Sequence, residues 1–191
     1  MTTLFDTNET PTATTAAGPR PLRVLALDLS ITATGICLPD GTTGTIKTNP
    51  KDGDRRLHRI TDVIGSALTD HGCDLVVIEG PVVRSSAAVT IGMVHGAVRL
   101  RLIDSDTPYV LITPATLKAY ATGRGNADKT AMAVAALKRT GCEFGDDNQC
   151  DAAWLRWAAL DWYGQPEFDL PKAQRDRLAK VVWPAREAVT S

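Results

Sequence analysis

Residues 22–38 read LRVLALDLSITATGICL, and this stretch decides the fold. Leu22 to Leu27 is almost wholly apolar and has the length of a strand that is buried on both faces. A second strand is expected from Thr32 to Leu38. The turn Pro39-Asp40-Gly41 follows, because Pro fixes φ and Gly allows a positive φ, and a third, β-branched strand is expected from Thr42 to Thr48. The chain is therefore expected to open with a three-stranded meander.

Helical and strand patterns alternate beyond this meander. Apolar residues at helical spacing predict a helix from Arg55 to His71, which Gly72 ends, and another from Ser86 to Ile103. Short apolar runs predict strands at Leu75–Ile78 and Tyr109–Ile112. The alternation predicts an α/β fold, in which a mixed β-sheet carries helices on both faces.

Three more helices are expected in the second half of the chain. Thr113 and Pro114 are typical of a helix start, and that helix runs to Tyr120. Asn126 is placed to cap a helix that ends near Arg139, and Asp146 or Asp147 to cap a last one that Gly164 ends.

The composition predicts one globular domain. The chain has 191 residues, of which 43% are hydrophobic, 23% charged and 5% aromatic, which excludes disordered, collagen-like and disulfide-scaffold proteins. A net charge of -1 means that any polyanionic partner must bind a local patch. No apolar run is long enough to span a membrane, so a cytoplasmic protein is expected. We expect a disordered polar arm over residues 1–20, a domain over 21–164, and a tail over 165–191 with a short helix from Lys172 to Val181.

Acidic residues follow two of the apolar strands. Asp28 ends the first and Glu79 ends the strand at Leu75–Ile78, and ligands of open α/β sheets bind outside such strand ends. Asp147 and Asp151 share a face of the last helix at i,i+4. Converging carboxylates repel each other unless a cation neutralises them, so these acids predict a hard-metal site. Singly, each has a plainer interpretation: Asp28 opens a turn, Glu79 pairs with a surface Arg, and Asp147 caps a helix.

The motifs in this order resemble a known family. Leu27-Asp28-Leu29-Ser30 with Thr34-Gly35, then Val77-Ile78-Glu79, and finally Asp151-Ala152-Ala153 resemble the RuvC family of Holliday junction resolvases, within the RNase H-like nucleases. Two segments between them, residues 113–118 and 123–129, are similar to the basic segment of that family. The resemblance covers roughly Leu22 to Tyr163, and the arm and the tail lie outside it.

The resemblance implies a homodimeric, magnesium-dependent endonuclease that nicks two opposed strands of a four-way DNA junction and leaves 5′-phosphate ends. It implies an RNase H-like sheet and two Mg²⁺ ions in each active site, with Mn²⁺ as a substitute. Asp28 would bridge the ions, and Glu79 and Asp151 would complete the set. We add Asp147 as a ligand and expect the small residues of the helix from Ser86 to Ile103 to allow close approach of a second copy.

Four basic residues are candidates for contact with DNA. Lys118 and Lys129 match basic positions that face the scissile phosphate in the family, and Lys129 is also a candidate catalytic residue. Arg124 in the glycine loop and Arg84 after the Glu79 strand could add phosphate contacts. For each, the plainer interpretation is a solvated surface side chain.

Two positions depart from the best-known family pattern. Val82-Val83 stand where the family has an aromatic wedge, and Asn148 stands where an acid or His often precedes the last Asp by three residues. Asp147 is its neighbour and could substitute as a ligand.

Two other functions remain open on the sequence alone. Residues 28–35, DLSITATG, also look like the first phosphate-binding hairpin of sugar kinases and actin-type ATPases, which would make the protein an ATP-binding phosphotransferase. The chain is short for the paired domains of those enzymes. The other alternative is a non-catalytic junction-binding protein with a degenerate acidic site.

Overall fold

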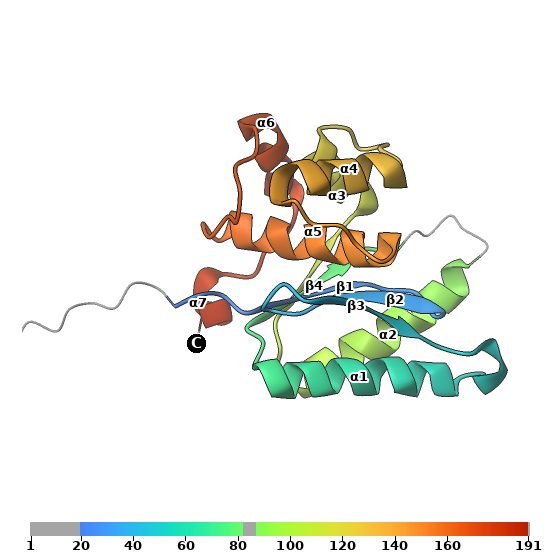
Figure 1. Cartoon of the computed structure of the whole chain (residues 1–191). Helices are drawn as coiled ribbons and strands as arrows, with labels where there is room; N and C mark the ends of the chain where they lie inside the picture. The colour runs from blue at the N-terminus through green and yellow to red at the C-terminus, as the bar shows by residue number, and fades with distance from the viewer. Residues whose placement is uncertain (1–19, 82–86, 191) are drawn as a thin grey trace, which may run out of the picture.

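A five-stranded mixed sheet forms the centre of the computed structural model, which describes residues 20–81 and 87–190 (Figure 1). The strand order is β3-β2-β1-β4-β5. β1 pairs antiparallel with β2 and parallel with β4; β2–β3 is antiparallel and β4–β5 parallel. The strands are β1 Val24–Asp28, β2 Ala33–Cys37, β3 Thr43–Lys47, β4 Leu75–Glu79 and β5 Tyr109–Ile112.

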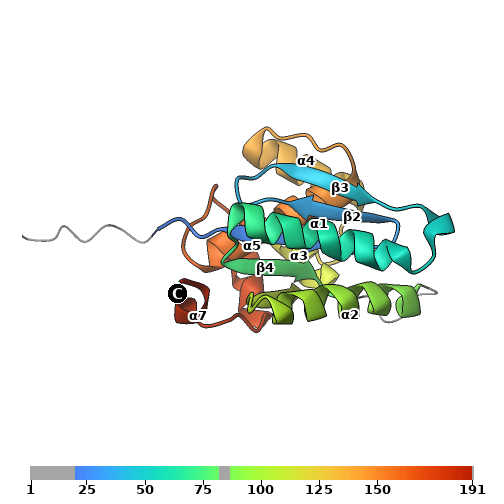
Figure 2. The ribbon, with the colours of Figure 1, turned by 90° about the horizontal axis from the view of Figure 1, so that it is seen from below.

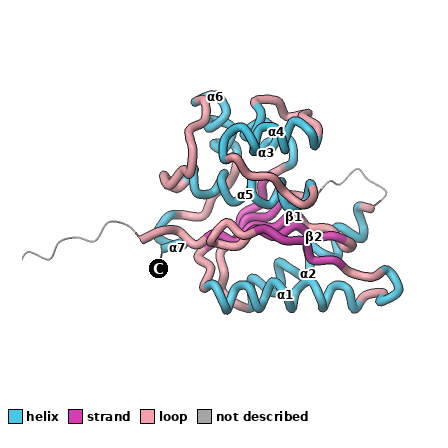
Figure 3. The backbone as a smooth tube through the Cα atoms, viewed as in Figure 1, coloured by secondary structure: helices cyan, strands magenta, loops and turns pink. Residues whose placement is uncertain are grey.

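Helices cover both faces of this sheet (Figure 3). On one face α1 packs against α2, as seen from below in Figure 2, and on the other α5 lies over β1 and β2. The helices α3 and α4 lie outside α5 (Figure 1). The main helices are α1 Arg55–His71, α2 Ala88–Asp104, α3 Pro114–Thr122, α4 Lys129–Thr140 and α5 Asp147–Trp162. The shorter ones are η1 Pro50–Asp52, α6 Lys172–Arg175, η2 Asp176–Lys180 and α7 Arg186–Thr190. The predicted α/β fold is thus confirmed.

Alternation along the strands divides the core into two layers. In β1, Val24 and Ala26 face the α5 layer while Leu25 and Leu27 face the α1–α2 layer, and all four are fully buried. The same alternation runs through β4 next to it. Strands that are apolar on both faces are what a sheet covered on both sides requires.

One predicted cap is wrong. Asp128, and not Asn126, caps α4, since its side chain accepts a hydrogen bond from the backbone N–H of Ala131. The turn before the helix continues to Ala127, whose N–H donates to the Arg124 carbonyl and whose side chain is buried. Ala127 is therefore a buried turn residue, and α4 begins at Lys129, later than predicted.

The tail after α5 folds back onto the domain. Leu170 and Leu178 are buried in the α5 layer, and Tyr163 donates a hydrogen bond of 2.8 Å to the Pro184 carbonyl. α6 and η2 lie against α3 (Figure 1). The described part of the tail contains α6 and the 3₁₀ helix η2, which lie on α3, and the short helix α7.

The amino-terminal arm is expected over residues 1–20, of which 1–19 lie outside the described residues. Arg20 forms an ion pair of 2.7 Å with Asp74. Across the described ranges, every helix is too short or too polar to cross a bilayer.

Candidate active site

Two acids meet at the carboxyl ends of β1 and β4. The strands are parallel neighbours with Leu27 opposite Ile78, so Asp28 and Glu79 follow side by side. Their carboxyl groups share a hydrogen bond. Behind Asp28 the chain turns tightly, with the Thr34 hydroxyl donating to the Ser30 carbonyl at 2.6 Å and accepting from the Ser30 N–H. Ser30 and Thr34 belong to the sequence motif, but the sequence alone does not predict that their hydrogen bonds stabilise the turn after Asp28.

The third acid comes from the helix that covers this strand. α5 lies over β1 and β2, and at Gly35 the two elements are so close that a Cβ there would lie 2.1 Å from the Asn148 carbonyl oxygen. One turn further along α5, Asp151 is close enough to Asp28 and Glu79 to repel the charges of both. The structure therefore brings together three predicted site residues from distant parts of the chain.

Burial raises the pKa of all three carboxyls, and repulsion from neighbouring acids adds to the rise. Burial and the charge of Asp151 raise the pKa of Asp28 to about 7. Burial and the charges of Asp28 and Asp151 raise the pKa of Glu79 to about 8, and burial raises that of Asp151 to about 6. Three half-buried carboxylates so arranged need a cation or a proton to balance their charge.

The fourth acid has a cationic partner. Asp147 begins α5 and forms an exposed ion pair with Lys129, which lowers the pKa of the carboxyl. The interpretation of Asp147 as the helix cap is wrong, because Asp146 occupies that position: it accepts from the Gln149 N–H at 2.9 Å and from the Thr45 hydroxyl at 2.6 Å. Asp147 is thus the first residue of α5 and not its cap.

Two predicted lysines flank the acids. Lys118, on α3, lowers the pKa of Glu79 and Asp151 through its charge. Lys129, the first residue of α4, has the same effect on Asp28 and Asp151. Two ammonium groups therefore lie near the carboxylates and can balance the charge of an incoming phosphate.

Of the two predicted arginines, the structure describes Arg124, which is not part of this cluster. Arg124 lies exposed in the loop between α3 and α4, where it lines a separate groove with Lys138 and Arg139. Arg84 lies outside the described residues, as do Val82 and Val83.

The acids fit a hard cation by their chemistry. Carboxylate oxygens are the ligands that Mg²⁺ prefers, and a cation bound among them would offset the burial and the repulsion that raise the pKa of Asp28 and Glu79. Within residues 20–81 and 87–190, no three His, Cys, Asp or Glu side chains form a ready-made metal-binding group. Asp28 and Glu79 share a hydrogen bond, and Asp147 forms an ion pair with Lys129.

Comparison with known proteins agrees with this geometry. Residues 30–152 match the family model of crossover junction endodeoxyribonuclease RuvC. The RuvC protein of Nocardia farcinica is 30% identical over 131 residues, which are 61% of this chain and 69% of that protein. The RuvC protein of Corynebacterium efficiens is 26% identical over 126 residues, 59% of this chain; the match spans only 56% of that relative's length.

Solved structures support the same fold. Thermus thermophilus RuvC superposes with a TM-score of 0.64 at 20% identity, over 75% of this chain and 98% of that one. The same protein in complex with a Holliday junction substrate gives a TM-score of 0.64 at 20% identity, over 75% of this chain and 97% of the other. With a family match over residues 30–152 and an acidic cluster at the strand ends, this chain belongs to the RuvC family of crossover junction endodeoxyribonucleases.

Proposed function

We propose that the protein is a metal-dependent endonuclease that resolves four-way DNA junctions by hydrolysing one phosphodiester bond in each of two opposed strands. The convergence of Asp28, Glu79 and Asp151 at the ends of β1 and β4 carries this proposal. Family membership supports it, and membership of a nuclease family leaves the phosphotransferase interpretation without support. The Thermus thermophilus relative, whose structure was solved with a Holliday junction, supports branched DNA as the substrate.

The four acids have distinct roles in the proposal. Asp28, Glu79 and Asp151 hold divalent metal, and Asp147 supplies a further carboxylate once it leaves Lys129. When bound, Mg²⁺, or Mn²⁺ in its place, makes water a nucleophile at neutral pH and stabilises the leaving 3′ oxygen, and a pair of ions does both in one displacement. Lys118 and Lys129 hold the scissile phosphate against this cluster and offset its charge. In this proposal Lys129 changes its partner: its ammonium group pairs with the Asp147 carboxylate in the free protein and with the DNA phosphate in the complex.

A homodimer would place one such site on each of two strands. The outer face of α2 carries apolar side chains in the described chain, with Val89, Met93, Leu100 and Ile103 between 42% and 78% exposed. Their spacing of three, four or seven residues puts them on one stripe of the helix. Open space beside Gly92 and Gly96 allows another backbone to approach closely. We propose that a second copy covers this stripe about a two-fold axis.

Cleavage of a labelled mobile four-way junction tests the function. We expect the protein to cut two opposed strands with Mg²⁺ and to cut none with Ca²⁺ or with a chelator. Asp28→Asn and Glu79→Gln should each lower the cleavage rate by more than about 100-fold, while junction affinity stays equal or rises, because the site loses negative charge near the phosphate. Asp62→Asn, on the exposed outer side of α1, is the matched control and should cut normally.

Other outcomes have definite meanings. Junction binding without cleavage under any metal condition would identify a non-catalytic junction-binding protein instead. Normal turnover in Asp28→Asn would overturn the assignment of the site. Parallel loss of binding and activity in that variant would mean that Asp28 maintains the fold.

A further inference from the structure

A small basic groove lies where the tail meets α3. The groove has a volume of about 220 Å³ and lies between η2, α3 and the glycine loop that follows α3. The tail contributes Arg177 and Lys180, and α3 contributes Thr116. The rest of the lining is small: Ala115, Ala119, Gly123 and Gly125. No acidic and no aromatic side chain lines it.

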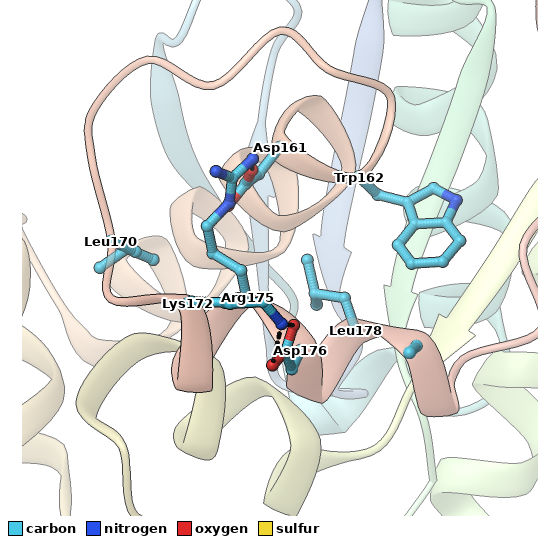
Figure 4. A pocket seen from close by; sticks show the side chains of 8 residues that line it. Asp161, Trp162, Leu170, Lys172, Arg175, Asp176 and Leu178 are labelled. Atoms are coloured by element: carbon cyan, nitrogen blue, oxygen red, sulfur yellow. Dashed lines mark hydrogen bonds and ion pairs between the residues drawn. The ribbon is translucent and has the colours of Figure 1, made fainter.

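The two cations of the groove are presented together and are unpaired. η2 is a 3₁₀ helix, in which residues three apart lie on the same side, so Arg177 and Lys180 point from one face. Within the described chain, neither makes an ion pair or a side-chain hydrogen bond. The two basic residues of the preceding helix α6 are paired instead: Lys172 pairs with Asp176 at 2.8 Å and Arg175 with the buried Asp161 at 2.5 Å (Figure 4).

The groove has rigid walls. Leu178, between the two cations in sequence, is buried at 1% exposure, and Gln174 donates a hydrogen bond of 2.9 Å to the Tyr120 carbonyl of α3. After η2, the Trp183 ring stacks on Trp162 with ring centroids 5.5 Å apart. These contacts hold the backbone of η2 against α3 and the end of α5, so that η2 presents Arg177 and Lys180 at the groove.

The lining selects phosphate over other ligands. The volume is below the roughly 300–1,000 Å³ of small-molecule sites, and bases would need an aromatic surface for stacking. Two cations and a hydroxyl are the groups that contact phosphate oxygens, and small residues let a backbone approach closely. The chain carries a net charge of -1, so such a local patch is what a polyanion needs.

The groove shares α3 with the proposed active site. α3 carries Lys118, next to the acids, and the glycine loop carries Arg124. The family match ends at residue 152, so Arg177 and Lys180 belong to a segment outside it. We propose that this groove binds the sugar-phosphate backbone of a duplex arm of the DNA substrate, which makes the tail a DNA-binding element. This inference rests on the proposed function for its substrate.

Salt-dependent binding tests the proposal. The affinity of the full chain for a four-way junction and for a linear duplex is measured with a chelator present, so that cleavage does not intervene, over a series of salt concentrations. We expect Arg177→Gln/Lys180→Gln to bind both DNAs about tenfold more weakly at 0.1 M salt. The slope of log K against log salt should fall by about 0.9 for each phosphate contact that is lost.

The tail supplies its own matched control. Lys172→Gln removes the same charge as Lys180→Gln from the same segment. Lys172, however, is paired with Asp176 and lines a different pocket. It should leave the affinity and the salt slope at their wild-type values. Circular dichroism and the melting temperature verify that each variant is folded.

The outcomes separate this inference from the proposed function. Unchanged affinity and slope in the double variant overturn the groove, even if the wild type cleaves junctions as proposed. Equal losses in Lys172→Gln and Lys180→Gln also overturn it, since the effect would then be one of net charge. A loss on the junction alone contradicts contact with a duplex arm. If the wild type binds both DNAs but cuts neither, the function fails, and the titration still decides the groove.

Discussion

At the scale of single residues, the acidic cluster sets a balance between protons and metal. The folded protein raises the pKa of Asp28, Glu79 and Asp151. These carboxyl groups therefore keep their protons at a pH at which the unfolded chain has lost them. Between about pH 4 and pH 8 the folded state therefore binds more protons, and the free energy of unfolding falls as pH rises. A bound cation offsets the repulsion between the ionised carboxylates and so restores the free energy of unfolding. We therefore expect metal to bind most tightly at high pH, where the metal-free site is least stable.

The first prediction concerns this pH dependence. Without metal, we expect the contribution of the three carboxyls to the free energy of unfolding to be lost as pH rises from about 5 to about 8. Asp28→Asn should flatten the dependence and stabilise the protein by about 1–2 kcal/mol at pH 8, because it removes a buried charge. Urea unfolding at both pH values measures this, and Mg²⁺ should stabilise the wild type more at pH 8. Asp62→Asn should behave like the wild type, and an equal pH dependence in Asp28→Asn would show that the cluster does not cause it.

The second prediction concerns Asp147. Asp147→Asn should leave the melting temperature close to wild type, because Asp146 caps α5 and an exposed ion pair with Lys129 contributes only about 0–1 kcal/mol. If Asp147 is a ligand, cleavage falls at least about tenfold and a higher Mg²⁺ concentration is needed for half-maximal rate. Cleavage rates over a Mg²⁺ series measure both effects. The neighbouring Asn148→Ala should remain active, and an inactive Asn148→Ala beside an active Asp147→Asn would assign the ligand to Asn148.

At the scale of elements, the packing of α5 on β2 positions the third acid. Gly35 permits this packing because the Asn148 backbone occupies the space of its missing Cβ. The contact is backbone against backbone, so no side-chain rotation can relieve a clash there. The distance between α5 and β2, and with it the position of Asp151 over Asp28, depends on this glycine.

The third prediction tests that contact. Gly35→Ala should destabilise the protein by at least about 2 kcal/mol and lower cleavage further than the loss of folded protein explains, because α5 must move away from β1 and β2. Gly44→Ala on the adjacent strand is the control, since a Cβ there meets the Ile36 side chain at an ordinary 3.5 Å. Denaturation and cleavage of both variants are compared. A fully stable and active Gly35→Ala would contradict this role for the glycine.

Some elements follow from sequence pattern alone, and others do not. The helix Arg55–His71 and the strand Tyr109–Ile112 have their predicted bounds, because apolar spacing and Gly72 define them locally. The predicted start of α4 is wrong because Asn126 and Asp128 both suit a cap, and only the burial of Ala127 selects between them. The acids at strand ends could be predicted from position. The ion pair of Asp147 with Lys129 could not, because α4 and α5 meet only in the folded chain.

At the scale of the whole molecule, α2 carries four large exposed apolar side chains within the described residues. The fourth prediction is that Leu100→Glu/Ile103→Glu, on its outer stripe, converts a dimer into a monomer, since two buried charges without partners oppose association. Light scattering measures the mass, and a cruciform plasmid reports whether nicks remain paired. Val182→Glu, at 92% exposure on the tail, is the control and should leave the mass unchanged. A wild-type protein that is monomeric while it makes paired nicks would contradict the dimer.

The distribution of the acids along the chain has a consequence during protein synthesis. Asp28 and Glu79 leave the ribosome early, but Asp151 and the helix that covers β1 and β2 are made after most of the domain. A nascent chain that stops before α5 lacks Asp147 and Asp151 and exposes one face of its sheet to water. The proposed nuclease therefore becomes active only after α5 has been synthesised, and incomplete chains do not cleave DNA.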